Sequence, residues 1–126
     1  MRTVVPLIMI VLLTGCAAKS YLQQWQGGTG ALTPHAGPVC LLTTPLSPSQ
    51  PSTLIGRAVA SKFFGGFAET FLALANTGRQ SGADAIIDMS SRYRPLLIPR
   101  AQAYGMAVKL AHPESFNCTA AGGKMY

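Results

Sequence analysis

The sequence predicts an α+β domain in which one helix packs on a small mixed or antiparallel sheet, in the order β-β-α-β-β. Residues 39–46 and 52–61 are rich in aliphatic and β-branched side chains, as in strands. Residues 67–81 carry apolar side chains at helical spacing, whereas residues 82–95 and 101–110 alternate with a period of two. We therefore expect a folded domain over residues 39–118 and an irregular tail over residues 119–126.

The first strand is expected in VCLLTTPL and ends at Pro45. The second strand, residues 52–61, is bounded by the turn cluster SPSQPS on its N-terminal side. Strict alternation places its side chains in two sets: Leu54, Gly56, Ala58 and Ala60 on one face, and Ile55, Arg57 and Val59 on the other.

The helix is predicted from Phe67 onwards, because Phe67, Phe71 and Leu74 fall on one stripe. Gly82 is the predicted stop, since glycine adopts the left-handed conformation without a Cβ clash. The preceding corner, KFFGGF, is expected to fold its phenylalanines over the core. A hydrophobic contact surface is the alternative for this corner.

The last two strands flank the turn PLLIPR. In residues 82–95 the alternation places Ala85, Ile87, Met89 and Tyr93 on one face and Asp88, Ser90, Arg92 and Arg94 on the other. In residues 101–110, Ala103 and Ala107 share a face. Together with Ala58 and Ala60 they mark where the helix is expected to approach the sheet closely.

The N-terminal stretch VVPLIMIVLLTGC predicts an export signal. Its apolar run, Val4 to Leu13, is shorter than the roughly 20 residues that span a bilayer. It has the length of a signal-peptide core and follows the basic Arg2. Leu13-Thr14-Gly15-Cys16 resembles a bacterial lipobox, which implies cleavage before Cys16 and attachment of palmitate-type chains there. An ordinary signal peptide or a buried strand are the alternatives.

Residues 1–15 are thus the expected lipoprotein signal peptide, and residues 16–38 the lipidated cysteine and a flexible tether. The tether prediction depends on frequent glycine, proline and small polar residues. Tyr21 and Trp25 either touch the membrane interface or dock on the domain.

Besides Cys16 the chain has two thiols, Cys40 and Cys118. An oxidising envelope compartment favours a disulfide between them. Free or intermolecular thiols, or a metal site completed by His35 and His112, are the alternatives.

The chain has a formal net charge of +6. Export argues against nucleic acid as a partner, so the positive charge favours a role at anionic envelope surfaces or in solubility. The domain contains four carboxylates and none of the spacings typical of catalytic or phosphate-binding motifs. Asp84 is expected to cap backbone groups and Asp88 to pair with Arg92. We therefore predict no enzyme, no cofactor and no metal.

A basic cluster surrounds the apolar turn between the last two strands. It predicts a partner or membrane contact formed by Arg92, Arg94, Leu96, Leu97, Ile98 and Arg100. The alternative is a solvated strand edge whose charges prevent edge-to-edge pairing.

Four segments, LLTTPL, IGRAVASKFFGG, GADAIID and YGMAVKL, resemble the YbjQ-like small domains. The lipobox, proline-containing tether and β-β-α-β-β order are also similar to the outer-membrane lipoprotein of the Rcs envelope-stress system. That lipoprotein has four domain cysteines, whereas this domain has two. The heavy-metal-binding description of YbjQ-like proteins transfers no ligands, because the matching positions here hold no ligand cluster.

The resulting expectation is a non-enzymatic envelope lipoprotein that binds an envelope protein as a sensor or assembly accessory. Ala17 is not the aspartate that retains many lipoproteins at the inner membrane, which favours the periplasmic face of the outer membrane. A metal- or small-ligand-binding module and a ring-forming homo-oligomer are the alternatives.

Overall fold

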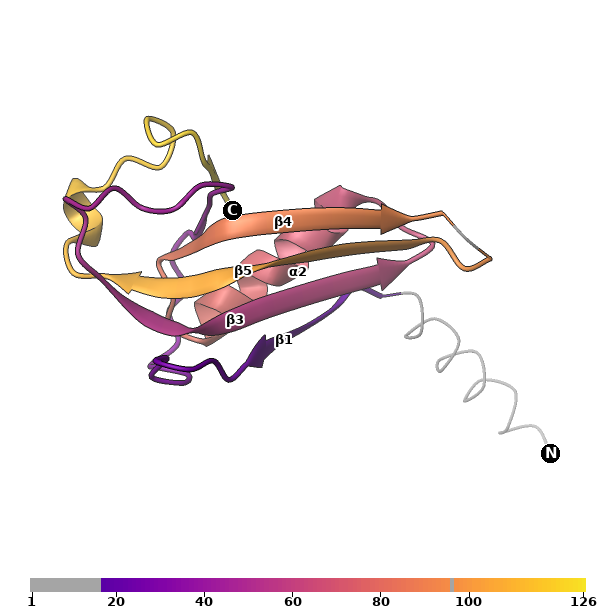
Figure 1. Ribbon diagram of the computed structural model, residues 1–126, viewed down its shortest axis with the longest axis horizontal. Helices are drawn as coiled ribbons and strands as arrows, with labels where there is room; N and C mark the ends of the chain where they lie inside the picture. The colour runs from indigo at the N-terminus through magenta and orange to yellow at the C-terminus, as the bar shows by residue number, and fades with distance from the viewer. Residues whose placement is uncertain (1–16, 96) are drawn as a thin grey trace.

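A computed structural model describes residues 17–95 and 97–126. The predicted signal peptide, the lipidation site Cys16 and the turn residue Leu96 lie outside the described residues. One helix packs on a six-stranded mixed sheet, which confirms the predicted α+β class (Figure 1). The elements are β1 (Lys19–Gln23), β2 (Cys40–Leu41), β3 (Ser52–Phe63), α2 (Phe67–Gln80), β4 (Ala85–Arg94), β5 (Arg100–Leu110), the 3₁₀ turn η1 (Pro113–Ser115) and β6 (Lys124–Met125).

The strand order is β1-β3-β5-β4-β2-β6. The three long strands β3, β5 and β4 lie side by side at the centre and run antiparallel. Short β2 joins β4 in parallel and pairs with β6 on its other side. The hairpin between β4 and β5 projects at one end of the sheet, whereas the C-terminal segment gathers at the other end (Figure 1).

The expected tether is wrong for residues 17–38, because they belong to the domain. β1 pairs antiparallel with β3 from Lys19 opposite Ser61 to Gln23 opposite Arg57. Beyond β1 the chain remains hydrogen-bonded: the Gly30 amide donates to the Ile55 carbonyl at 2.9 Å. Glycines and prolines here shape turns whose backbone groups are satisfied by the sheet and helix, rather than a flexible link.

The end of α2 anchors the same segment. Gly82 has a φ of +81° and the amide of Ala83 donates to the Gly78 carbonyl at 2.8 Å, so the predicted glycine stop is confirmed.

Hydrogen bonds also connect the end of α2 to residues 17–38. The Leu32 amide donates to the Ser81 carbonyl at 2.9 Å. The Arg79 guanidinium donates to the carbonyls of Gly37 and Tyr126, both at 2.8 Å, and so ties this segment to the C-terminus.

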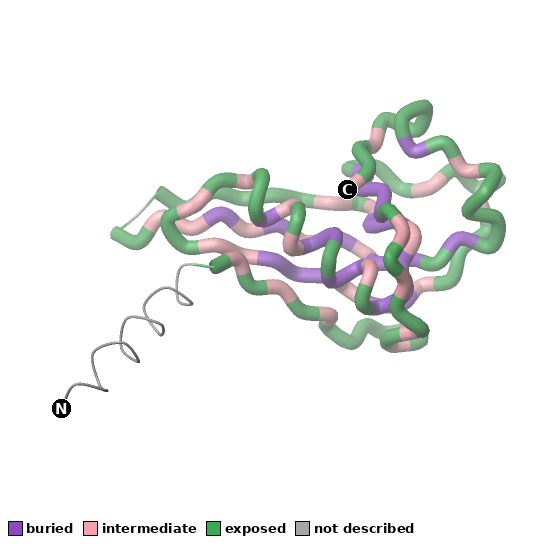
Figure 2. Tube along the Cα trace, turned by 180° about the vertical axis from the view of Figure 1, so that it is seen from behind, coloured by how far each residue is buried: buried purple, intermediate pink, exposed green. Residues whose placement is uncertain are grey.

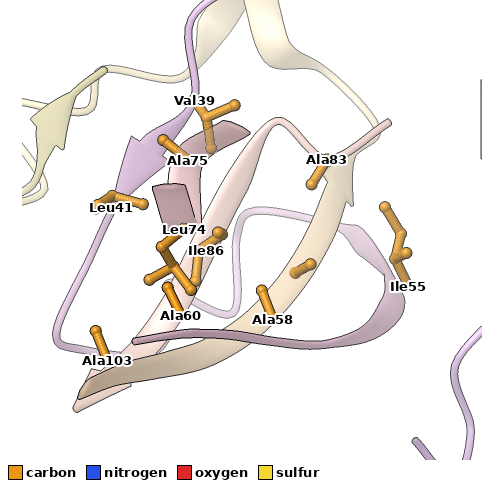
Figure 3. Packing of buried hydrophobic residues seen from close by; sticks show 11 residues of the cluster. Val39, Leu41, Ile55, Ala58, Ala60, Leu74, Ala75, Ala83, Ile86 and Ala103 are labelled. Carbon is orange, nitrogen blue, oxygen red and sulfur yellow. The ribbon is translucent and has the colours of Figure 1, made fainter. Parts of the chain in front are cut away.

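The helix approaches the sheet closely because the facing strand positions are small, as predicted. Leu74 and Ala75 of α2 pack with Ile86 against the alanines of β3 and β5 (Figure 3). Gly105 shares this face; a Cβ built there would lie 2.6 Å from Ile86 Cγ2 and 3.0 Å from the Ile87 carbonyl oxygen. The alanines that line the contact are Ala58, Ala60, Ala103 and Ala107.

Two bulges overturn the predicted strand faces. The β3–β5 register shifts between Leu54 and Gly56, so Ile55 is buried on the helix side with Ala58 rather than opposite it. The β4–β5 register shifts between Ile87 and Ser90, where Asp88 has a φ of +51°. One extra residue reverses the alternation. As a result Met89 packs on the helix side, whereas Ile87 packs on the opposite face.

A disulfide joins Cys40 to Cys118 and organises the end of the sheet away from the hairpin. Both cysteines are buried among Leu42, Val108 and Phe116, on the face opposite α2. The C-terminal tail is only partly irregular, contrary to the prediction, because Lys124–Met125 forms β6 against β2. These pairs complete backbone hydrogen bonds that β2 would otherwise leave unpaired.

Replacing Gly105 tests the close packing of helix and sheet. The Gly105→Ser variant should lose about 1–3 kcal/mol of unfolding free energy, because the added atoms overlap Ile86 and Ile87. Urea denaturation followed by circular dichroism measures this change. Gly66→Ser is the matched control, since a Cβ there meets nothing within 4 Å. Equal stabilities of the two variants would contradict the packing described here.

Removing the disulfide tests the organisation of the far end. The bond closes a separation of 78 residues, so Cys40→Ala with Cys118→Ala should reduce the free energy of unfolding by about 4 kcal/mol in the chain-entropy model. Urea denaturation of the double variant and the native protein measures this difference. Reduced native protein serves as the control and should unfold at a similarly lowered urea concentration. A loss below about 1 kcal/mol would be incompatible with a bond that crosslinks the native core.

Candidate interaction surface

The face of the sheet opposite α2 is only partly covered. At the disulfide end, Leu42 and Phe116 pack on it together with Ile87. Nearer the hairpin the residues that alternate with the helix-facing alanines point away from α2. We call this region the open face; register assigns to it Lys19, Tyr21, Gln23, Arg57, Val59, Ser61, Ser90, Arg92, Gln102, Tyr104 and Met106.

Arg57 lies between two aromatic rings on the open face, in the row that it forms with Gln23 of β1 and Met106 of β5. Its guanidinium carbon lies 4.3 Å from the Tyr104 ring centroid and 5.3 Å from that of Trp25. Trp25 lies two residues beyond β1 and docks on the domain through its contact with Arg57, although 42% of its surface remains exposed. Stacking on two rings limits the orientations of the guanidinium and leaves its edge available for a planar acceptor such as a carboxylate.

Positive charge dominates the open face because its residues include no carboxylate, and the aspartate and glutamate side chains of the described residues lie at other places in the fold. Glu69 pairs with Lys62, and Glu114 lies near His112. Asp84 accepts from the Leu110 amide at 2.9 Å, which confirms its predicted capping role, and also contacts Lys109. The expected Asp88–Arg92 ion pair is absent from the described residues, since Asp88 sits in the bulge. The open face as defined here contains the cations Lys19, Arg57 and Arg92, and the register continues the same face toward the hairpin with Arg94 and Arg100.

The second exposed feature is the end of the sheet that bears the β4–β5 turn. We call it the hairpin end and define it by Lys19, Phe64, Arg94, Leu97, Ile98 and Arg100. Figure 2 shows that the chain is mostly exposed there. Leu97 is fully exposed and Ile98 is 57% exposed. The predicted exposure of this apolar turn between arginines is therefore confirmed for Leu97 and Ile98.

The phenylalanine corner joins the hairpin end rather than the core. The Phe64 amide donates to the Pro99 carbonyl at 2.8 Å, which connects the end of β3 with the hairpin. Phe64 has a φ of +56°, an unfavourable conformation for a bulky residue, and is 68% exposed. Phe63 is also exposed, with the Arg100 guanidinium 5.3 Å from its ring centroid. The prediction that this corner covers the core is therefore wrong for Phe63 and Phe64, and holds in part for Phe67, which stacks on Phe71.

The residues considered for metal binding have other roles. Cys40 and Cys118 are bonded to each other. Both ring nitrogens of His35 contact backbone groups: Nε2 the Ala83 carbonyl at 2.6 Å and Nδ1 the Gly37 amide at 3.0 Å. Within residues 17–95 and 97–126, no three His, Cys, Asp or Glu side chains are grouped as a metal site requires.

In the same part of the chain, no helix combines the length and the apolar character needed to cross a membrane.

Comparisons with models of protein families, with curated proteins and with solved structures find no match to this chain. The YbjQ-like resemblance therefore stays a prediction from four short motifs.

The sequence prediction missed the contribution of Trp25, Arg57 and Tyr104 to the surface. The sequence indicated part of this surface, because the alternation in each strand places Arg57 and Tyr104 on the face opposite the small residues that mark the helix side. The missing information was that β1 brings Trp25 beside them.

Trp25 is the single tryptophan of the chain and reports directly on the open face. The Arg57→Ala variant should make Trp25 more accessible to acrylamide quenching and cost about 0.5–1 kcal/mol of stability, because the stacked guanidinium is lost. Fluorescence quenching and urea denaturation measure the two effects. Arg92→Ala is the control, since Arg92 is exposed on β4, which β3 and β5 separate from β1. The same quenching in all three proteins would show that Trp25 does not dock on Arg57.

Proposed function

We propose that this protein is an exported lipoprotein, anchored through Cys16 at the periplasmic face of the outer membrane, whose domain acts by binding and not by catalysis. The lipobox-like sequence Leu13–Cys16 supports export and anchoring. The Cys40–Cys118 disulfide supports the same compartment, because such bonds persist in oxidising environments. The partner is an acidic surface of another envelope protein, and the domain acts as a sensor or an assembly accessory for it.

The observation that carries the binding role is the arrangement of Trp25, Arg57 and Tyr104 on the open face. These residue types dominate the energetics of protein interfaces. Arg57 is already oriented by two rings, so binding a carboxylate immobilises less side-chain freedom than it would for an extended arginine. Lys19 and Arg92 lie in the row of Ser61 and Gln102, four residues along β3 from Arg57 toward the hairpin. They extend the positive charge in that direction and complement an acidic partner.

The anchoring part of the proposal is tested by mass spectrometry of the native protein from its membrane fraction. The expected product begins at Cys16 and carries the mass of a diacylglyceryl group and an amide-linked acyl chain. The Cys16→Ser variant should retain its signal peptide and lack the lipid mass. An unmodified native product that begins at Met1 would refute the anchor.

The binding part is tested by crosslinking in intact cells followed by purification. Arg57→Glu should reduce recovery of the crosslinked envelope protein by at least about tenfold, because a close interfacial charge pair contributes about 1.5 kcal/mol or more. Lys124→Glu is the matched charge reversal, since Lys124 lies on β6 at the opposite edge of the sheet from β1. Equal recovery from Arg57→Glu and Lys124→Glu would remove the open face from the proposal.

A further inference from the structure

The hairpin end and the start of β1 lie at the same end of the sheet. Lys19 pairs with Ser61, two residues before the last residue of β3. That last residue, Phe63, pairs with Arg100, which in turn pairs with Arg94 at the base of the hairpin. The register of four strands therefore places the first described residues of the chain beside the hairpin, as Figure 1 also shows.

The chain between Cys16 and β1 is short. Only Ala17 and Ala18 separate Cys16 from Lys19. Three steps between Cα atoms span at most about 11 Å. An acyl anchor at Cys16 therefore holds the hairpin end close to the bilayer, whereas a free tether of residues 16–38 would leave the orientation of the domain undetermined.

The chemistry of the hairpin end fits the surface of such a bilayer. Phe64, Leu97 and Ile98 form an exposed apolar group, connected by the hydrogen bond from Phe64 to Pro99. Arg94 and Arg100 flank this group on the hairpin strands. Apolar side chains beside arginines match the boundary between acyl chains and phosphates, where each basic residue contributes about 1 kcal/mol near an anionic surface.

We propose that the hairpin end is a membrane-docking surface whose occupant is a bilayer with anionic phospholipid headgroups. Leu97, Ile98 and Phe64 enter the headgroup region, and Arg94 and Arg100 contact lipid phosphates. This inference rests on the proposed function, since acylation of Cys16 supplies the proximity. In this orientation the 12 residues of β3 extend roughly 40 Å away from the membrane. The open face then remains accessible to a partner from the side.

Site-specific fluorescence on the mature lipidated protein tests the orientation. An environment-sensitive NBD label is placed at Leu97→Cys in one protein and at Ser49→Cys in another. Ser49 is the control because it is exposed and precedes β3, at the end of the sheet away from the hairpin. Both proteins are reconstituted into phosphatidylcholine–phosphatidylglycerol vesicles with or without spin-labelled lipid, and their lipid mass and circular dichroism are checked first.

The label at position 97 should shift its emission to shorter wavelength and be quenched by spin-labelled lipid, whereas the label at position 49 should show neither effect. Equal, weak quenching at both positions in a protein that carries its lipid mass would overturn the docking orientation and leave the anchor intact. A protein without lipid mass would instead refute the proposed function.

The role of charge is tested in the same vesicles. Arg94→Ala should lower the ratio of docked to undocked label about fivefold, the equivalent of about 1 kcal/mol at an anionic surface. Lys124→Ala is the control and should leave the ratio unchanged. The assignment of anionic headgroups as the occupant would be overturned by either of two results. One is an equal ratio for the labelled proteins with and without Arg94→Ala. The other is equal docking of the labelled protein on vesicles of phosphatidylcholine alone and on vesicles that contain phosphatidylglycerol.

Discussion

The pairing of β1 with β3 is the constraint on which the rest of the structure depends. It converts a glycine- and proline-containing segment into part of the domain and brings Trp25 onto Arg57. It also determines which end of the sheet lies beside the start of the described chain. A lipid anchor three residues before β1 would therefore orient the domain, because too little chain remains for the domain to rotate freely. The orientation proposed for an anchored domain thus depends on the backbone pairing of β1 with β3.

Small residues and bulges divide the sheet into two faces with different uses. Alanines and Gly105 on one face allow α2 to pack closely and build most of the core. α2 lies on that side, and no α-helix of the described residues covers the other side. The arginine and aromatic side chains of the second face therefore stay near solvent. The disulfide and the C-terminal segment cover only the end of this second face that is distant from the hairpin. The helix-packed core and the proposed binding surface are therefore opposite faces of the same strands.

The class of the fold and the central elements could be predicted from periodicity, and Gly82 from its conformational freedom. β1 could not, because KSYLQ is short and its partner, β3, is more than thirty residues away in the chain. The faces of Ile55 and Ile87 could not either, since a bulge depends on pairing with β5 and leaves no mark in the alternation of one strand. The exposed Leu97 and its arginines were predictable from local sequence, whereas the joining of Phe64 to that hairpin depends on a contact between distant segments.

Hydrogen exchange of the native protein, followed by mass spectrometry of peptides that contain residues 19–23, tests the central constraint most directly. If β1 is paired with β3, the amides of this segment that are hydrogen-bonded to β3 should exchange far more slowly than those of a flexible chain. Exchange of the whole segment at the rate of an unstructured peptide would show that residues 17–38 form a free tether. The short connection between anchor and sheet, and the orientation inferred from it, would then be wrong.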